Sequence, residues 1–295
     1  MNDLSIDPSG VDSAAVSAAA AIVQALDAKA ERFQTPCGDG HMLWRRWGEG
    51  PPVVLVHGGA GAWSHWIRNI EPLMARHTVW APDMPGLGES ASPAEFTVEA
   101  IGAPIAEGIR LLLPADESFD LVGFSFGGPV SAFAASRLPG RVGHYVLAAS
   151  RFVLEDRNVF PRLVPWKQFE DPSERLAAHR RNLELMMITD PDRIDALALH
   201  IQSSNAPRSR FYGPKLQPGE KLHEYLPQVR AKSITAISGE KDHVAVPIMD
   251  QQASALQSIH AHARFHAIAG AGHWVQYEAA ERFNELLDAA LHGDE

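Results

Sequence analysis

Gly123-Phe124-Ser125-Phe126-Gly127-Gly128 is the most informative segment of this 295-residue chain. The apolar run Phe119 to Val122 precedes it, and the small and apolar residues from Val130 to Ala135 follow it. The pattern predicts a strand, a tight turn and a helix, the setting in which Gly-x-Ser-x-Gly exposes a serine at the end of a sheet. Glycines two residues before and after the serine are needed because a Cβ there would clash with neighbouring backbone. Ser125 is therefore the candidate nucleophile.

Further apolar runs on both sides of this turn indicate strands that are buried on both faces of a parallel sheet. They are Val53 to Val56, Thr78 to Trp80, Tyr145 to Ala148, Ile234 to Ile237 and, more weakly, Phe265 to Ile268. Residues Phe33 to Trp47 are predicted to form two short strands around a glycine-containing turn. Helical segments separate most of the runs: Trp66 to Arg76, Val98 to Leu113, Gly128 to Leu138, Met249 to Ile259 and Val275 to Leu291. This alternation predicts an α/β fold with a largely parallel sheet of eight strands flanked by helices.

Two segments do not follow the alternation. The alanine-rich residues 1–32 predict an N-terminal helical extension. Residues 151–230 contain helical segments and proline-containing loops without a buried-strand pattern, so we expect a helical cap inserted between two strands. Residues 33–150 and 231–295 would then form the core.

Composition excludes several classes of function. The formal net charge of −10 argues against nucleic acid or an anionic membrane surface as the main partner. The single cysteine, Cys37, excludes an intramolecular disulfide and a cysteine-based zinc site. The N-terminus lacks the basic start of a signal peptide, and no run approaches the roughly 20 apolar residues of a membrane span. We expect a cytoplasmic protein that acts on a small molecule without a metal or organic cofactor. Homo-oligomerisation stays open.

A serine nucleophile needs a base, and the base needs an acid that orients it. His273 follows the last predicted strand, in a loop that can carry an imidazole to the serine turn. Asp242 follows the strand Ile234 to Ile237, where a carboxylate emerges at the carboxyl end of the sheet. Glu240 is the nearest competitor for the acid, and Glu155 or Asp156 is a less favoured second position.

The oxyanion of an acyl-transfer transition state needs preorganised hydrogen-bond donors. The Phe126 N–H, directly after the serine, is one candidate. The second is expected from the glycine-rich loop His57-Gly58-Gly59-Ala60-Gly61 after the strand Val53 to Val56, and Gly59 N–H is the choice. A phosphate-binding loop is the weaker reading, because neither phosphate-loop glycine pattern fits.

From about Phe33 to Leu291 the chain resembles the α/β-hydrolase superfamily, whose order of serine, acid and histidine it shares. The resemblance also rests on three further segments: His57-Gly58-Gly59, Asp83-Met84-Pro85-Gly86-Leu87-Gly88-Glu89-Ser90 and Gly239-Glu240-Lys241-Asp242. The turn at Asp83 is interpreted as structural. Members of the superfamily that act on haloalkanes or epoxides carry an aspartate at the nucleophile position, so Ser125 argues against both activities.

The stretch Gly272-His273-Trp274-Val275-Gln276-Tyr277-Glu278 is similar to the C-terminal part of meta-cleavage-product hydrolases, which split a C–C bond. That group usually has asparagine before the serine, where this chain has Phe124. The resemblance implies a cap arginine that holds a substrate carboxylate, and Arg208 and Arg210 are the candidates. The other predicted substrate contacts are Gly58, Phe124 and Trp274.

Three functions follow. The leading hypothesis is hydrolysis of a small, largely apolar ester, with cap residues such as Trp166, Met186 and Met187 shaping the pocket, together with Phe152, Phe160 and Phe211. The second is hydrolysis of a C–C bond in a dienoate ketone. The third, of a different class, is a ligand-sensing protein that keeps the fold with little turnover.

Overall fold

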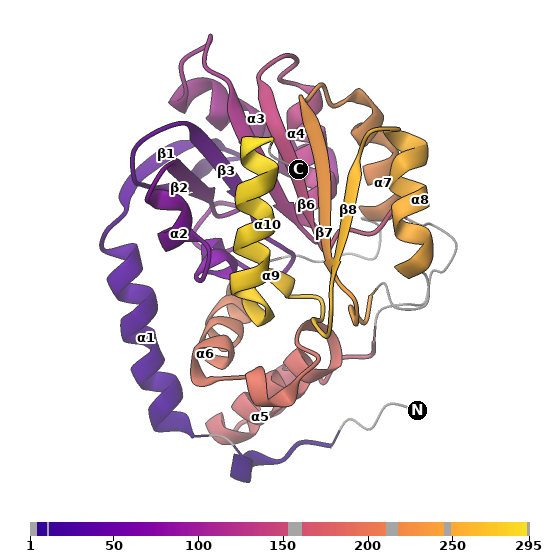
Figure 1. Cartoon of the computed structure of the whole chain (residues 1–295). Helices are drawn as coiled ribbons and strands as arrows, with labels where there is room; N and C mark the ends of the chain where they lie inside the picture. The colour runs from indigo at the N-terminus through magenta and orange to yellow at the C-terminus, as the bar shows by residue number, and fades with distance from the viewer. Residues whose placement is uncertain (1–4, 11, 153–160, 211–217, 245–248, 294–295) are drawn as a thin grey trace.

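A computed structural model describes residues 5–10, 12–152, 161–210, 218–244 and 249–293 of the chain. Its centre is an eight-stranded sheet with the strand order β1-β2-β4-β3-β5-β6-β7-β8 (Figure 1). The strands are β1 (Glu31–Cys37), β2 (Gly40–Trp47), β3 (Pro52–Val56), β4 (Thr78–Pro82), β5 (Phe119–Phe124), β6 (Val142–Ala148), β7 (Ser233–Gly239) and β8 (Arg264–Ile268). The pairs β1–β2 and β2–β4 are antiparallel, and all the others are parallel. Every apolar run that predicted a strand lies in this sheet, so the predicted fold class is confirmed.

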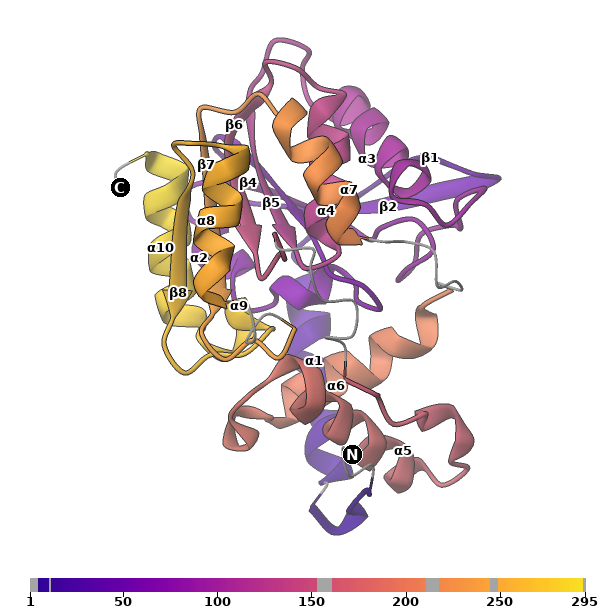
Figure 2. The ribbon, with the colours of Figure 1, turned by 90° about the vertical axis from the view of Figure 1, so that its right-hand side faces the viewer.

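Helices cover both faces of the sheet (Figure 2). One face carries α2 (Ile70–Met74), α9 (Val275–Glu278) and α10 (Ala280–His292); the other carries α3 (Val98–Leu112), α4 (Gly127–Ser136) and α8 (Met249–Ile259). The central strands β3 and β4 are buried along their whole length, which explains why they read as continuous apolar runs. Two hydrophobic clusters, one on each face, form the core.

The residues of the predicted cap include α5 (Pro172–Asn182), the π-helical turn η4 (Leu183–Met187) and α6 (Ala196–Asn205). These helices lie beyond the sheet, at the bottom of Figures 1 and 2. The helix α7 (Pro218–Tyr225) is different, because it packs against α4 of the core and buries Leu222 and Tyr225 there. The predicted domain limits stay a prediction, but within residues 151–230 the helices beyond the sheet are α5 and α6.

The alanine-rich N-terminal segment forms α1 (Ser13–Asp27), whose first turn is capped by the Asp12 carboxylate. Helix α1 packs along α6, and β1 already begins at Glu31. Its last turn is tied to β2, because the Trp47 indole N–H donates to Leu26 O at 2.9 Å. None of the helices in the described ranges is long and apolar enough to cross a membrane.

Several short 3-10 helices lie before or between these elements in the described residues. They are η1 (Pro8–Gly10), η2 (Trp63–Trp66), η3 (Trp166–Gln168), η5 (Pro191–Arg193), η6 (Ala206–Arg208) and η7 (Leu226–Gln228).

Candidate active site

Ser125 stands on a strained turn between β5 and α4. Its φ of +51° places a residue with a Cβ in the left-handed region, which is costly and must be held by the surrounding structure. The Ser125 N–H donates to Ala148 O at the end of β6 (2.9 Å), and Ser125 O accepts from Gly128 N–H (2.9 Å). These two bonds fix the turn, so the hydroxyl is aimed by backbone rather than by its own rotamer alone.

The flanking glycines are required by contact distance. A Cβ on Gly123 would lie 2.3 Å from Ser131 Oγ, and one on Gly127 would lie 2.5 Å from both Val56 O and His57 O. The turn is thus pressed against the end of β3, as the sequence pattern predicted.

The loops after β7 and β8 bring a carboxylate and an imidazole to this serine. His273 Nε2 lies 2.8 Å from Ser125 Oγ, and His273 Nδ1 lies 2.8 Å from Asp242 Oδ2. Because a carboxylate accepts hydrogen bonds, Nδ1 carries the proton and Nε2 is left to accept from the serine hydroxyl. Asp242 is 1% exposed, and its second oxygen accepts the Val244 N–H at 2.9 Å.

The competitors for the acid have other places. Glu240 is exposed and its carboxylate accepts the Gly270 N–H at 3.0 Å, which ties together the two loops rather than reaching the imidazole. Glu155 and Asp156 lie outside the described residues. The structure thus brings together Ser125, His273 and Asp242, the three residues predicted from chain order.

The glycine-rich loop after β3 lies beside the serine turn. A Cβ on Gly59 would be 3.6 Å from the Cβ of Phe126, so the two residues predicted to donate to an oxyanion are neighbours. The loop is held by His57, whose Nδ1–H donates to Gly58 O (2.8 Å) and whose Nε2 accepts the Met84 N–H (2.9 Å). Burial lowers the pKa of His57, which keeps the imidazole neutral, and only the neutral ring can make both bonds.

The turn that begins at Asp83 also holds the segment that follows the glycine-rich loop. Asp83 Oδ1 accepts the Trp63 N–H (2.9 Å), and Oδ2 accepts the Glu89 N–H (3.1 Å). The buried Arg45 on β2 donates to Asp83, Glu89 and Asp27. The contacts are those of a structural turn.

Phe124 and Trp274, two of the predicted substrate contacts, are the chain neighbours of Ser125 and His273, and Gly58, a third, packs against Phe124. A Cβ on Gly58 would lie 2.8 Å from the Phe124 ring, whose centroid is 5.4 Å from that of His273. Trp274 is fully buried and donates its indole N–H to His65 O at 3.0 Å. Their role toward a substrate stays a prediction.

His65 is a neighbour of the site that sequence reasoning missed. Its ring lies 5.5 Å from the Phe124 ring and 5.1 Å from Trp274, centroid to centroid. Burial lowers the pKa of His65 well below its usual value, so the ring is neutral. A Cβ on Gly61 would lie 2.0 Å from Cε1 of this ring. The only available signal was the position of His65 four residues after the glycine-rich loop.

The two candidate arginines differ in their surroundings. Arg210 N–H donates to Gly86 O at 3.0 Å, and its guanidinium donates to Ser90 O and to Ser92 Oγ. It is thus attached to the turn that begins at Asp83. Arg208 ends η6 and is exposed. A role of either in holding a substrate carboxylate stays a prediction.

Comparison with known proteins agrees with this architecture. Residues 51–280 match the family model of the α/β-hydrolase fold. The 2-hydroxymuconate semialdehyde hydrolase of Pseudomonas sp. (strain CF600) is 30% identical over 253 residues, which span 81% of this chain and 86% of that protein.

Solved structures show the same fold. A meta-cleavage product hydrolase from Pseudomonas fluorescens IP01 superposes with a TM-score of 0.72 at 23% identity, over 89% of this chain and 98% of that one. A carboxylesterase from Bacillus subtilis superposes with a TM-score of 0.69 at 18% identity, over 94% of this chain and 99% of that one. At these identities the likeness concerns the fold, which is shared by an enzyme named a meta-cleavage product hydrolase and one named a carboxylesterase.

Proposed function

The chain belongs to the α/β-hydrolase fold family, and we propose that within it the protein is a serine hydrolase of small, largely apolar esters. The single observation that carries the proposal is the position of the His273 imidazole, 2.8 Å from the serine oxygen on one side and 2.8 Å from the Asp242 carboxylate on the other. This is the arrangement of a nucleophile, a base and an orienting acid.

The reaction begins when His273 Nε2 takes the proton of Ser125 Oγ as the oxygen attacks the ester carbonyl carbon. The N–H groups of Gly59 and Phe126 donate to the oxyanion, and the helix α4 that starts behind the serine adds its positive end. His273 returns the proton to the leaving alcohol, and an acyl-enzyme remains. Water, deprotonated by His273, then releases the acid.

Asp242 acts on the imidazole alone. It holds the proton on Nδ1, so that Nε2 faces the serine as an acceptor, and it stabilises the imidazolium that forms in the transition state. Because Asp242 and His273 are both buried, this interaction is screened little by solvent.

The surroundings favour an apolar acyl or alcohol group. The Phe124 ring lies beside the base, and the rings of His65, Trp66 and Trp274 pack behind it. Buried Met187 and half-buried Met186 come from the cap side. The predicted pocket residues Phe160 and Phe211 lie outside the described residues, and Phe152 packs in the core against the face that carries α3 and α4.

Hydrolysis of a C–C bond in a dienoate ketone is a second candidate. Two observations favour it: a second relative at 30% identity is named a 2-hydroxy-6-oxo-2,4-heptadienoate hydrolase, and that compound is a dienoate ketone; the stretch from Gly272 to Glu278 also resembles the meta-cleavage-product hydrolases. The same three side chains would serve, since the carbonyl of an activated ketone can also be attacked by the serine. Against it stands Arg210, whose guanidinium is engaged by the turn at Ser90 and Ser92.

A substrate screen of purified protein separates the candidates. Nitrophenyl acetate and butyrate report ester cleavage by release of nitrophenolate, and the absorbance of a coloured dienoate ketone reports C–C cleavage. We expect ester turnover that Ser125→Ala reduces by roughly 10⁴-fold or more. The matched control is Ser136→Ala, on the last turn of the same helix, where the hydroxyl only donates to Phe133 O at 2.7 Å.

Unchanged ester turnover in Ser125→Ala would overturn the mechanism. Decay of the dienoate without ester turnover would instead select the second candidate. A ligand-sensing protein would show neither activity, and it would not react rapidly with a fluorophosphonate probe, because only an activated serine does.

A further inference from the structure

We propose that Glu278, which sequence reasoning did not assign, is a positioning residue that sets the place of the base His273 and couples it to the cap. The inference rests on the proposed role of His273 as the base. Glu278 is a buried residue of α9, and the described contacts of its carboxylate go to two different parts of the molecule.

The Glu278 carboxylate is held by backbone donors. Glu278 is 2% exposed. Oε2 accepts the Gly272 N–H at 2.7 Å, and Oε1 accepts the Asp190 N–H at 2.9 Å. The Thr189 N–H is shared between the two oxygens at 3.0 and 3.2 Å. All these donors are N–H groups, so the carboxyl acts only as an acceptor, and charge-assisted bonds of this kind are about twice as strong as neutral ones.

The donors are placed where they control the base. Gly272 is the residue before His273, and Trp274, the residue after it, donates its N–H to Met187 O at 2.7 Å. The backbone on both sides of the imidazole is therefore attached to the segment Met187–Asp190. Met187 is the last residue of η4, which directly follows α5. The segment is therefore continuous with the helices that lie beyond the sheet.

The same segment reaches the acid. Thr189 Oγ1 donates to Lys241 O at 3.2 Å, and the Lys241 N–H donates to Ala271 O at 2.8 Å. Lys241 immediately precedes Asp242. The segment Met187–Asp190 thus holds both the loop that carries the base His273 and the loop that carries the acid Asp242.

The packing leaves little room for adjustment. A Cβ on Gly272 would lie 2.6 Å from Thr189 Oγ1 and 3.0 Å from Glu278 Oε2. Only a glycine at position 272 lets the loop that carries His273 approach the Glu278 carboxylate so closely. A shift of the Met187–Asp190 segment must therefore shift Gly272, and with it the imidazole.

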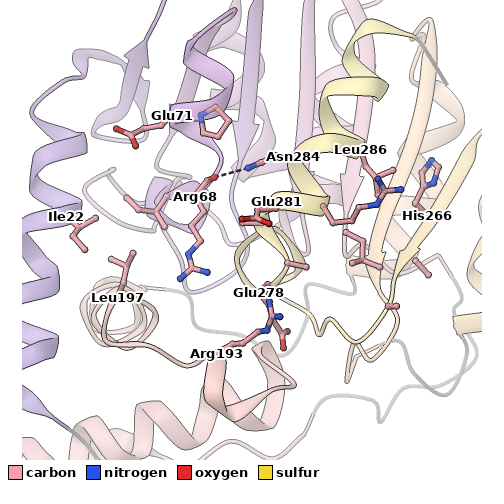
Figure 3. A pocket seen from close by; sticks show the side chains of 18 of the residues that line it. Ile22, Arg68, Glu71, Arg193, Leu197, His266, Glu278, Glu281, Asn284 and Leu286 are labelled. Atoms are coloured by element: carbon pink, nitrogen blue, oxygen red, sulfur yellow. Dashed lines mark hydrogen bonds between the residues drawn. The ribbon is translucent and has the colours of Figure 1, made fainter.

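On its other side Glu278 borders a groove of about 1440 Å³ between α1, α6, α10 and β8 (Figure 3). Arg193, which lies beside Glu278 in that view, donates to Glu278 O at 2.5 Å. Arg68, in the same groove, donates to Tyr277 O (3.0 Å) and to Asp195 (2.5 Å). These cations reinforce the attachment of α9 to the cap, and they leave the carboxylate of Glu278 to the N–H groups.

The test is Glu278→Gln. A glutamine has one acceptor oxygen and one NH₂ group, so at least one of the N–H donors would face another donor. We expect kcat for the ester to fall roughly 10- to 100-fold, since a misplaced base costs about that much, while KM stays within about threefold. The rate constant for fluorophosphonate labelling of Ser125 should fall by the same factor. The matched control is Glu281→Gln, an exposed glutamate three residues on, for which both rates should be unchanged.

A milder variant separates positioning from folding. Thr189→Val keeps the backbone N–H groups and removes only the bond to Lys241 O, so kcat should fall by roughly two- to fivefold with the melting temperature nearly constant. All rates are measured per folded molecule, well below the melting temperature of each variant. If Glu278→Gln melts earlier but keeps the wild-type kcat and labelling rate, Glu278 is structural and the proposal is wrong.

The two proposals can fail separately. If the wild-type protein reacts with neither ester nor probe, the proposed function fails. The position of His273 is then followed by the NMR signal of its Nδ1–H, which the bond to Asp242 shifts far downfield. Loss of that signal in Glu278→Gln, with its retention in Glu281→Gln, supports the positioning role; an unchanged signal overturns it.

Discussion

Arg45 Nη1 lies 3.1 Å from Asp83 Oδ2, and each of the two side chains is 1% exposed. This buried pair connects β2 to the turn that holds the glycine-rich loop, since the same carboxylate accepts the Trp63 N–H. Arg45 also donates to Asp27 at the end of α1 at 2.5 Å. One guanidinium therefore joins the N-terminal helix to the support of the candidate active site.

Arg45→Met should destabilise the protein strongly, because it leaves Asp83 as a buried charge without its cation. We expect the free energy of unfolding to fall by about 3–5 kcal/mol, measured by urea denaturation. Arg46→Met is the control, since the neighbouring ion pair with Glu31 is at the surface (2.9 Å) and should contribute less than about 1 kcal/mol. Equal losses in the two variants would contradict the structural role of the buried pair.

Gly127→Ala should damage the serine turn by steric contact. The added methyl would lie 2.5 Å from Val56 O and His57 O, so the backbone must shift, at a cost of about 1–3 kcal/mol or more. We expect a lower melting temperature and slower probe labelling of Ser125. Gly10→Ala, at a place with nothing within 4 Å of the new Cβ, serves as the control. A Gly127→Ala protein as stable and as reactive as the wild type would refute the close approach.

Asp242→Asn should leave the site folded but with the imidazole in the wrong tautomer. The asparagine amide can donate to Nδ1, which would move the imidazole proton to Nε2. Nε2 can then no longer accept the proton of the serine hydroxyl. We expect kcat to fall by roughly 10³- to 10⁴-fold. Glu240→Gln, two residues earlier, should change kcat by less than about threefold, since its carboxylate only accepts the Gly270 N–H. The reverse order of effects would make Glu240 the acid.

Stability should depend on pH through buried histidines. Burial lowers the pKa of His179 to about 4 from 6.5, and it also lowers the pKa of His57 and His65. Between pH 6.5 and about 4 the His179 ring is protonated in the unfolded chain but neutral in the folded one, and the lowered pKa of the other two rings acts in the same direction. The unfolded state then binds more protons, so stability is fully present above pH 6.5 and is lost as the pH falls toward 4.

His179→Phe tests this at one position. Phenylalanine keeps an aromatic ring beside Trp166, whose centroid is 4.8 Å from that of His179, and it cannot be protonated. Between pH 7 and pH 4 the free energy of unfolding should fall less in the variant than in the wild type, and the difference should be at most about 3 kcal/mol. Urea denaturation at a series of pH values measures it. The same pH dependence in both proteins would show that His179 does not contribute.

Some of the site could be predicted because its chemistry needs particular residue types in a local pattern. Ser125 was found from two glycines, an apolar run before them and a helical run after them. Asp242 and His273 were found because each follows its own strand, and parallel strands end at the same edge of a sheet. The limits of the strands were approximate. The run Thr78 to Trp80, for instance, extends to Pro82 because β4 pairs with β2 as well as with β3.

Other residues gave no local signal. His65 lies between tryptophans in η2, and its neighbours in the sequence do not indicate that it packs against Gly61 and Phe124. The role of Glu278 has no local sequence signal, because the groups that donate to its carboxylate are backbone N–H groups, which every residue except proline has. Helix α7 reads like its neighbours in the insertion, yet it packs on the core.

Apolar periodicity and glycine placement act over a few neighbouring residues, so the sheet, the serine turn and the order of nucleophile, acid and base can be predicted from the amino-acid sequence. How those three side chains are held depends instead on contacts between segments that are distant in the chain. Gly272, Thr189 and Lys241 are far apart in the chain, and their contact depends on how the cap packs against α9. Packing of that kind is a property of the whole fold, so no short stretch of sequence contains it.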